Sequence, residues 1–226
     1  MTKIDGAVIL VVGASGGLGS RVSERLAAQG ALVVRAGRNP AHLSGPGAYL
    51  ADLRTEAGAA SLISAAIAEH GKLDGIVIAA GVVAFGPASE LEDATLTELF
   101  EVNALGPIRL ITRGFPALAE SATGGREPFV LTISGVVSEA PTAGLAAYSS
   151  AKAALSAFVG AVSREYRRSG IRVLDARPGH TDTGLATRAI AGTAPAFGAA
   201  LDPDAVADRL VKAIADGERD LPPSAF

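Results

Sequence analysis

The chain of 226 residues is 49% hydrophobic and 19% charged, so it can bury a sizeable core, and disorder over most of its length is excluded. Its net charge of −3 and its 4% aromatic content argue against a nucleic-acid-binding surface. The absence of cysteine rules out disulfides, thiolate metal sites and cysteine nucleophiles. The three histidines, His42, His70 and His180, lack the spacing of metal ligands, so we expect no metal site.

The first apolar run of the chain, residues 7–12, is short and ends at Gly13. A signal peptide needs a longer apolar stretch after a basic segment, and a membrane span needs about 20 apolar residues. We therefore expect a soluble cytoplasmic protein that has no membrane partner.

Short apolar runs alternate along the chain with longer segments of helical periodicity. Strands that read as continuous apolar runs are buried on both faces of a sheet. The sequence therefore predicts a single α/β domain over residues 1–226, built on a doubly wound parallel sheet. The predicted strands cover residues 7–12, 31–35, 75–79, 129–133 and 171–176, with a weaker one at 48–50, and the predicted helices lie near residues 18–29, 57–70, 96–118, 149–169 and 204–216.

The first predicted strand runs into the stretch Gly13-Ala14-Ser15-Gly16-Gly17-Leu18-Gly19 and then directly into a helix. Glycines let the backbone bend sharply and approach a ligand, and the helix N-terminus offers free N–H groups to a diphosphate. The spacing Gly-x-x-x-Gly-x-Gly differs from the commoner Gly-x-Gly-x-x-Gly. The order of strand, turn and helix favours a dinucleotide site over an ordinary glycine-rich turn.

The end of the second predicted strand indicates which dinucleotide binds. Enzymes that bind NAD place Asp or Glu here to hold the ribose hydroxyls, whereas a basic residue suits a 2′-phosphate. This chain has Gly37 at that position and Arg38 beside it. The pattern favours a role for Arg38 in binding the 2′-phosphate of NADP(H) over the role of an ordinary solvated surface residue. Arg35 is a weaker candidate for the same contact.

A second motif, Tyr148-Ser149-Ser150-Ala151-Lys152, opens a predicted helix. Residues four apart lie on one helical face, so the Tyr148 hydroxyl and the Lys152 ammonium can address the same place. A phenol has a pKa near 10, and a nearby cation favours the phenolate and lowers that pKa toward the working range. The spacing is frequent by chance, so its weight comes from the other motifs.

Together these motifs resemble the short-chain dehydrogenase/reductase family over nearly the whole chain. The resemblance implies a Rossmann-type NAD(P)-binding fold of about seven strands, the last reduced to residues 220–222. It also implies a hydride transfer that interconverts a carbonyl and a secondary alcohol. The matching pieces are the loop from Gly13 to Gly19, Asp52-Leu53, Ala79-Ala80-Gly81, Asn103, Ser134, Tyr148, Lys152 and Pro178-Gly179-His180-Thr181.

The resemblance also implies roles for single residues. Tyr148 would be the general acid or base, and Lys152 would hold the nicotinamide ribose and lower the pKa of Tyr148. Ser134 would hydrogen-bond the substrate oxygen, and Asn103 would hold a water that links Lys152 to solvent. The implied cofactor contacts are Gly13, Ser15, Gly16, Gly17, Leu18, Gly19, Arg38, Asp52, Leu53, Ala80, Gly81, Tyr148, Lys152, Pro178, Gly179 and Thr181.

Two departures separate this chain from the family pattern. The usual Asn-Asn-Ala-Gly is Ile78-Ala79-Ala80-Gly81 here, and the position of the usual serine, 13 residues before the tyrosine, is Gly135. Ser134 and Ser138 are the neighbouring hydroxyls. We favour Ser134 because it ends a strand, where the backbone is well fixed, and because Gly135 permits a turn that re-aims its neighbour.

The leading hypothesis is an NADP(H)-dependent oxidoreductase that acts on a small-molecule carbonyl or alcohol. The alternative is an NADP(H)-binding sensor or regulatory protein with little turnover, and a sugar-nucleotide epimerase would need a larger C-terminal region. Small apolar residues over about 184–202 predict a substrate loop for a modest, partly hydrophobic ligand, and we interpret His180 as a solvated loop residue. By the resemblance we expect a homodimer or homotetramer.

Overall fold

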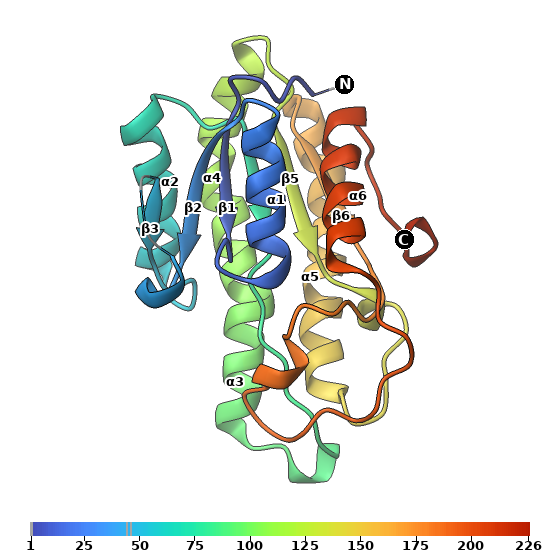
Figure 1. Ribbon diagram of the computed structural model, residues 1–226. Helices are drawn as coiled ribbons and strands as arrows, with labels where there is room; N and C mark the ends of the chain where they lie inside the picture. The colour runs from blue at the N-terminus through green and yellow to red at the C-terminus, as the bar shows by residue number, and fades with distance from the viewer. Residues whose placement is uncertain (1, 44, 46) are drawn as a thin grey trace.

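The computed structural model describes residues 2–43, 45 and 47–226. Its centre is a sheet of six parallel strands in the order β3-β2-β1-β4-β5-β6 (Figure 1). This Rossmann-like order confirms the predicted doubly wound sheet. The strands are β1 (Val8–Val12), β2 (Leu32–Gly37), β3 (Ala48–Leu50), β4 (Gly75–Ile78), β5 (Phe129–Ile133) and β6 (Arg172–Ala176).

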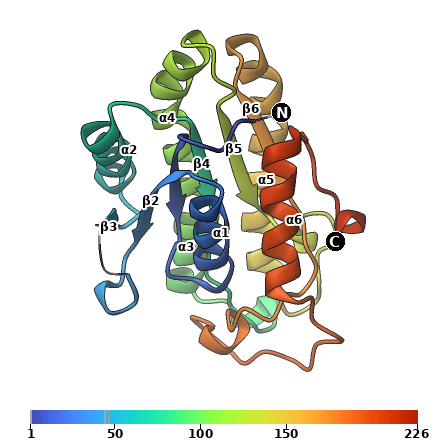
Figure 2. The same cartoon turned by 45° about the horizontal axis from the view of Figure 1, so that its top comes forward.

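Helices cover both faces of the sheet, as the alternating sequence pattern predicts (Figure 2). Helices α1 (Gly17–Ala28) and α6 (Pro203–Asp216) pack on one face, and α2 (Glu56–His70), α4 (Gly106–Thr123) and α5 (Ala146–Tyr166) pack on the other. Strand β1 shows why its sequence is continuously apolar. Leu10 points into the core under α2, α4 and α5, while Ile9 and Val11 point into the core under α1 and α6.

The helix predicted near residues 96–118 is confirmed as a helical segment, and a π turn divides it into two α-helices. Helix α3 (Asp93–Phe100) and α4 are joined by Glu101–Leu105, where the Gly106 N–H bonds to the Glu101 carbonyl five residues back. Pro107 has no N–H to donate to the Asn103 carbonyl four residues earlier, and its ring would clash with that carbonyl. The widened turn places Asn103 in a type of irregularity that is frequent at functional sites.

The expected seventh strand is reduced to a single contact. Within the described part of the chain, Leu221 forms an isolated parallel bridge with Ala176 at the free edge of β6. Its N–H bonds to the Asp175 carbonyl, and the Arg177 N–H bonds to the Leu221 carbonyl. No helix among the described residues combines the length and apolar character that crossing a membrane requires.

Candidate active site

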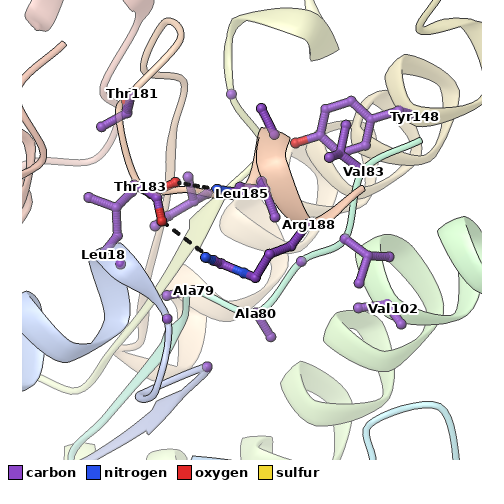
Figure 3. Close-up of a pocket in the computed structure, with 18 of the residues that line it drawn as sticks. Leu18, Ala79, Ala80, Val83, Val102, Tyr148, Thr181, Thr183, Leu185 and Arg188 are labelled. Atoms are coloured by element: carbon purple, nitrogen blue, oxygen red, sulfur yellow. Dashed lines mark hydrogen bonds between the residues drawn. The ribbon is translucent and has the colours of Figure 1, made fainter. Parts of the chain in front are cut away.

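A cavity of about 990 Å³ lies at the carboxyl edge of the sheet, where β1 and β4 are neighbours and the strand order reverses (Figure 3). Ligands of open α/β sheets bind in such a crevice. Of the site residues that the sequence predicts, all but Gly19 and Asn103 line it. The predicted lining residues are Gly13, Ser15, Gly16, Gly17, Leu18, Arg38, Asp52, Leu53, Ala80, Gly81, Ser134, Tyr148, Lys152, Pro178, Gly179 and Thr181.

In the loop between β1 and α1, the backbone packs so closely that glycine is required at several positions. A Cβ on Gly13, which has a φ of +84°, would lie 2.5 Å from the Ala80 nitrogen. A Cβ on Gly19 would overlap the carbonyl oxygen of Gly13. No described side chain caps α1 at Gly16, so its first amides face the cavity without a side-chain acceptor. This cradle fits the diphosphate of a dinucleotide.

Charged residues line the part of the cavity at the carboxyl end of β2. Arg38 is half-exposed and lies 3.6 Å from Glu98 of α3. Asp52 is held by a hydrogen bond from Arg54, and this bond lowers the pKa of the Asp52 carboxyl. The exposed Arg38–Glu98 pair contributes little stability, so Arg38 can exchange it for another anion.

Helix α5 carries the two residues of the Tyr-x-x-x-Lys motif into the cavity. Tyr148 is half-buried, and Figure 3 shows its hydroxyl directed toward the cavity. Lys152 is buried, its ammonium donates to the Ile133 carbonyl at 2.8 Å, and its nitrogen lies 5.9 Å from the Tyr148 ring centroid. The predicted helical spacing therefore does place a phenol and an amine at one end of the cavity.

The sequence matches the model of a family described as short chain dehydrogenase over residues 7–193. An uncharacterized oxidoreductase of Methylorubrum extorquens is 32% identical over 206 residues, which cover 85% of this chain and 81% of that protein. The chain belongs to the short-chain dehydrogenase/reductase family.

Two solved structures share the fold of this family member. A crystal structure of 3-ketoacyl-(acyl-carrier-protein) reductase from Brucella melitensis complexed with NADH has a TM-score of 0.87 at 24% identity, covering 97% of each chain. A short chain dehydrogenase from Burkholderia cenocepacia in complex with NADP has a TM-score of 0.83 at 22% identity, covering 99% of this chain and 90% of that one. The structural similarity of this chain to both proteins therefore covers nearly all of its residues.

Asn103, in the π turn, lies behind the cavity wall. Its amide donates to the carbonyls of Val82 and Leu99, both at 2.9 Å, and its oxygen accepts the Val82 N–H at 3.2 Å. A Cβ on Gly81 would lie 3.0 Å from this oxygen and 3.6 Å from the Lys152 nitrogen. Asn103 and Lys152 therefore flank Gly81, and a side chain at residue 81 would crowd both.

The two serines next to Gly135 have partners away from the cavity. Ser134 is fully buried, and its hydroxyl donates to the Asp175 carboxylate of β6 at 2.5 Å. The Ser138 hydroxyl, in the 3₁₀ turn Val136–Ser138, lies 2.8 Å from the Gly135 carbonyl and 3.2 Å from the Ser134 oxygen. Ser134 is part of the cavity wall, but Asp175 holds its proton. Its role as a donor to substrate stays a prediction.

The wall near Tyr148 is apolar and comes from segments far apart in the sequence. Phe85 and Phe197 pack at a centroid distance of 5.9 Å, and His180 stacks on Phe197 at 4.3 Å. His180 is an exposed loop residue, as the sequence analysis expects, and the stacking on Phe197 is a contact that the sequence did not indicate. The Phe85 N–H bonds to the Ala191 carbonyl at 2.9 Å, which fixes the loop after β6 across the segment after β4. Sequence analysis missed these aromatic residues because no local motif marks them.

Thr183 is another lining residue that the sequence analysis missed. A Cβ on Gly17 would lie 2.6 Å from the Thr183 Cβ, so Thr183 covers the first turn of α1. The predicted Thr181 also lines the cavity, but the residue that packs on Gly17 is Thr183, two residues later in the chain. Its place two residues after the predicted Thr181 is the signal that could have found Thr183.

Burial shifts the pKa values of the motif in opposite directions. It raises the pKa of the Tyr148 hydroxyl to about 12 and lowers the pKa of the Lys152 ammonium to about 8, against the opposing charge of Asp175. Burial is the cause of the raised pKa of Tyr148, and the expected lowering of that pKa by Lys152 stays a prediction. Burial disfavours the charged form of each group, which is the phenolate of Tyr148 and the ammonium of Lys152.

We therefore expect that Tyr148 stays protonated in the protein alone up to pH 10.0, the ordinary tyrosine pKa. The other tyrosines, Tyr49 and Tyr166, also have raised pKa values, Tyr49 through its hydrogen bond to Glu69 and Tyr166 through burial. The measurement is the tyrosinate ultraviolet absorbance of the wild type minus that of Tyr148→Phe across this pH range. A Tyr148-dependent component with a midpoint below 10 would contradict the prediction.

Proposed function

We propose that the protein is an NADP(H)-dependent oxidoreductase that interconverts a carbonyl and a secondary alcohol, with Tyr148 as the general acid or base. The observation that carries the proposal is one continuous cavity with an uncapped helix start at one side and the Tyr148–Lys152 pair at another. NADH and NADP in the two structural neighbours support a nicotinamide cofactor. The geometry does not favour the regulator alternative, since cofactor binding alone does not require a proton donor at the end of the cavity.

The cofactor would lie along the carboxyl edge of the sheet. The loop from Gly13 to Gly19 would receive its diphosphate, and Asp52, Leu53, Ala80 and Gly81 would border its adenosine. The segment from Pro178 to Thr181 would border the nicotinamide, within reach of Tyr148. When bound, the cofactor supplies or accepts the hydride.

The chain itself handles the proton. In carbonyl reduction Tyr148 donates its hydroxyl proton to the substrate oxygen, and burial favours the protonated form that this direction requires. The buried Lys152 ammonium would hold the ribose, and with a pKa of about 8 it can exchange its proton near neutral pH. Asn103, on the other side of Gly81, would hold the water that links Lys152 to solvent.

The apolar wall of Phe85, Phe197 and Val83 favours a hydrophobic carbonyl compound over a highly polar one. We expect a small-molecule substrate and no nucleic-acid or membrane partner. A cytoplasmic homodimer or homotetramer remains the assembly that we propose.

Tyr148→Phe should keep cofactor affinity and lower turnover by about a hundredfold or more, since it deletes the proton donor and little volume. Lys152→Ala should harm both binding and turnover. The assay is NADPH oxidation with a panel of ketones and aldehydes, alongside a fluorescence titration of the cofactor. Wild-type turnover in Tyr148→Phe would overturn the mechanism, and cofactor binding without turnover on any carbonyl would favour a regulator.

Arg38→Ala should weaken NADPH binding by about tenfold and leave NADH binding nearly unchanged, because only NADPH carries the 2′-phosphate. The variant Glu98→Gln is the matched control, since it removes the carboxylate that competes for Arg38. It should keep or raise the affinity for NADPH. Equal losses for the two cofactors in Arg38→Ala would contradict NADP(H) preference through this residue.

Ser134→Ala should lower kcat by less than the roughly hundredfold that loss of a free oxyanion donor costs, because Asp175 holds the Ser134 proton. Ser138→Ala should lower kcat by less than Ser134→Ala does, since Ser138 is not among the described lining residues. The measurement is kcat with NADPH affinity as the control. A loss of a hundredfold or more in Ser134→Ala would show that its proton turns to the substrate during reaction.

A further inference from the structure

Arg188 reaches from the loop after β6 into the cavity. It ends the 3₁₀ turn Ala186–Arg188, and its guanidinium lies 3.4 Å from the Thr183 carbonyl. A Cβ on Gly184 would lie 2.8 Å from the same guanidinium, so Arg188 folds back along residues 183–184. Figure 3 shows the guanidinium directed toward Thr183 and away from the Tyr148 hydroxyl.

This direction leads to the start of α1. Thr183 packs on Gly17, in the first turn of the helix whose amides have no described side-chain cap. The guanidinium therefore lies beside the place where a diphosphate meets the free N–H groups of α1. It is separated from the reacting end of the cavity, where Tyr148 and Lys152 lie.

The loop that carries Arg188 is fixed on both sides of the cavity. The Ile190 N–H bonds to the Val83 carbonyl at 2.8 Å, and the Leu201 N–H bonds to the His180 carbonyl at 2.7 Å. Isolated parallel bridges join Ala84 to Ala191 and Thr181 to Leu201. Arg188 lies between these anchors, so the backbone places it over the cavity rather than at a free loop tip.

The charges of the cavity also point to an anion at Arg188. None of the salt bridges among the described residues involves Arg188, whereas Arg38 is paired with Glu98 and the lining carboxylate Asp52 is paired with Arg54. A guanidinium is a planar fork of donors that matches the oxygens of a phosphate. Among the described residues Arg188 has no carboxylate partner and the start of α1 has no side-chain cap, and this combination is suited to a diphosphate.

We propose that Arg188 binds the diphosphate of the dinucleotide from the loop side, opposite the amides of α1. The proposal rests on the proposed function, because it assumes a dinucleotide in this cavity. It adds a cofactor contact that lies outside the glycine-rich loop and comes from a segment with no phosphate-binding motif.

The test compares two fragments that differ in the second backbone phosphate. 2′-Phospho-ADP-ribose has the complete diphosphate, whereas adenosine 2′,5′-bisphosphate has only one of its two phosphates. Arg188→Gln should weaken binding of NADPH and 2′-phospho-ADP-ribose by about tenfold and change that of the bisphosphate by much less. Calorimetry at low and high salt measures these affinities, and the loss should shrink as salt screens the charge.

Arg168→Ala is the matched control, since Arg168 is an exposed arginine beyond the C-terminal end of α5. It should leave all three affinities unchanged. Unchanged affinity of Arg188→Gln for NADPH and 2′-phospho-ADP-ribose would overturn the proposal, as would an effect confined to the KM of carboxylate-bearing carbonyl substrates. A wild type that binds none of the three ligands would overturn the proposed function itself.

Discussion

The site depends on one steric constraint, the close approach of the β1–α1 turn to the end of β4. Gly13 and Ala80 are so near that a Cβ on Gly13 would lie 2.5 Å from the Ala80 nitrogen. Their strands are neighbours where the sheet order reverses, so the connections leave toward opposite faces and a crevice opens between them. The α1 amides, Gly81 and the Tyr148–Lys152 pair are all placed relative to this crevice.

A buried polar layer under the cavity is the second determinant. Asp175 accepts hydrogen bonds from Thr132 at 2.7 Å and Ser134 at 2.5 Å, and Arg177 lies 3.7 Å away. Arg177 is held in turn by Glu139 and Asp220. A buried carboxylate that lacked these partners would cost several kcal/mol, which is why the Ser134 hydroxyl faces Asp175 rather than the cavity.

Burial also decides the chemistry of the motif on α5. The same exclusion of water that raises the pKa of Tyr148 lowers that of Lys152. The phenol thus keeps its proton, while the amine is poised near neutral pH. Burial thus favours the protonated phenol that the proposed donor role of Tyr148 requires, while the spacing of the two residues on the helix brings them together.

The sequence by itself determined the sheet, its flanking helices and the cavity residues that belong to local motifs. Local signals suffice there, because apolar runs, a glycine-rich turn and residues four apart on a helix fix structure over short stretches. Tertiary structure alone decided the rest. The π turn at Asn103, the Asp175 partner of Ser134, the stacking of His180 on Phe197 and the approach of Arg188 to Thr183 join different elements or parts of a long loop. No local periodicity records such contacts, because their energies depend on which distant segments the folded sheet brings together.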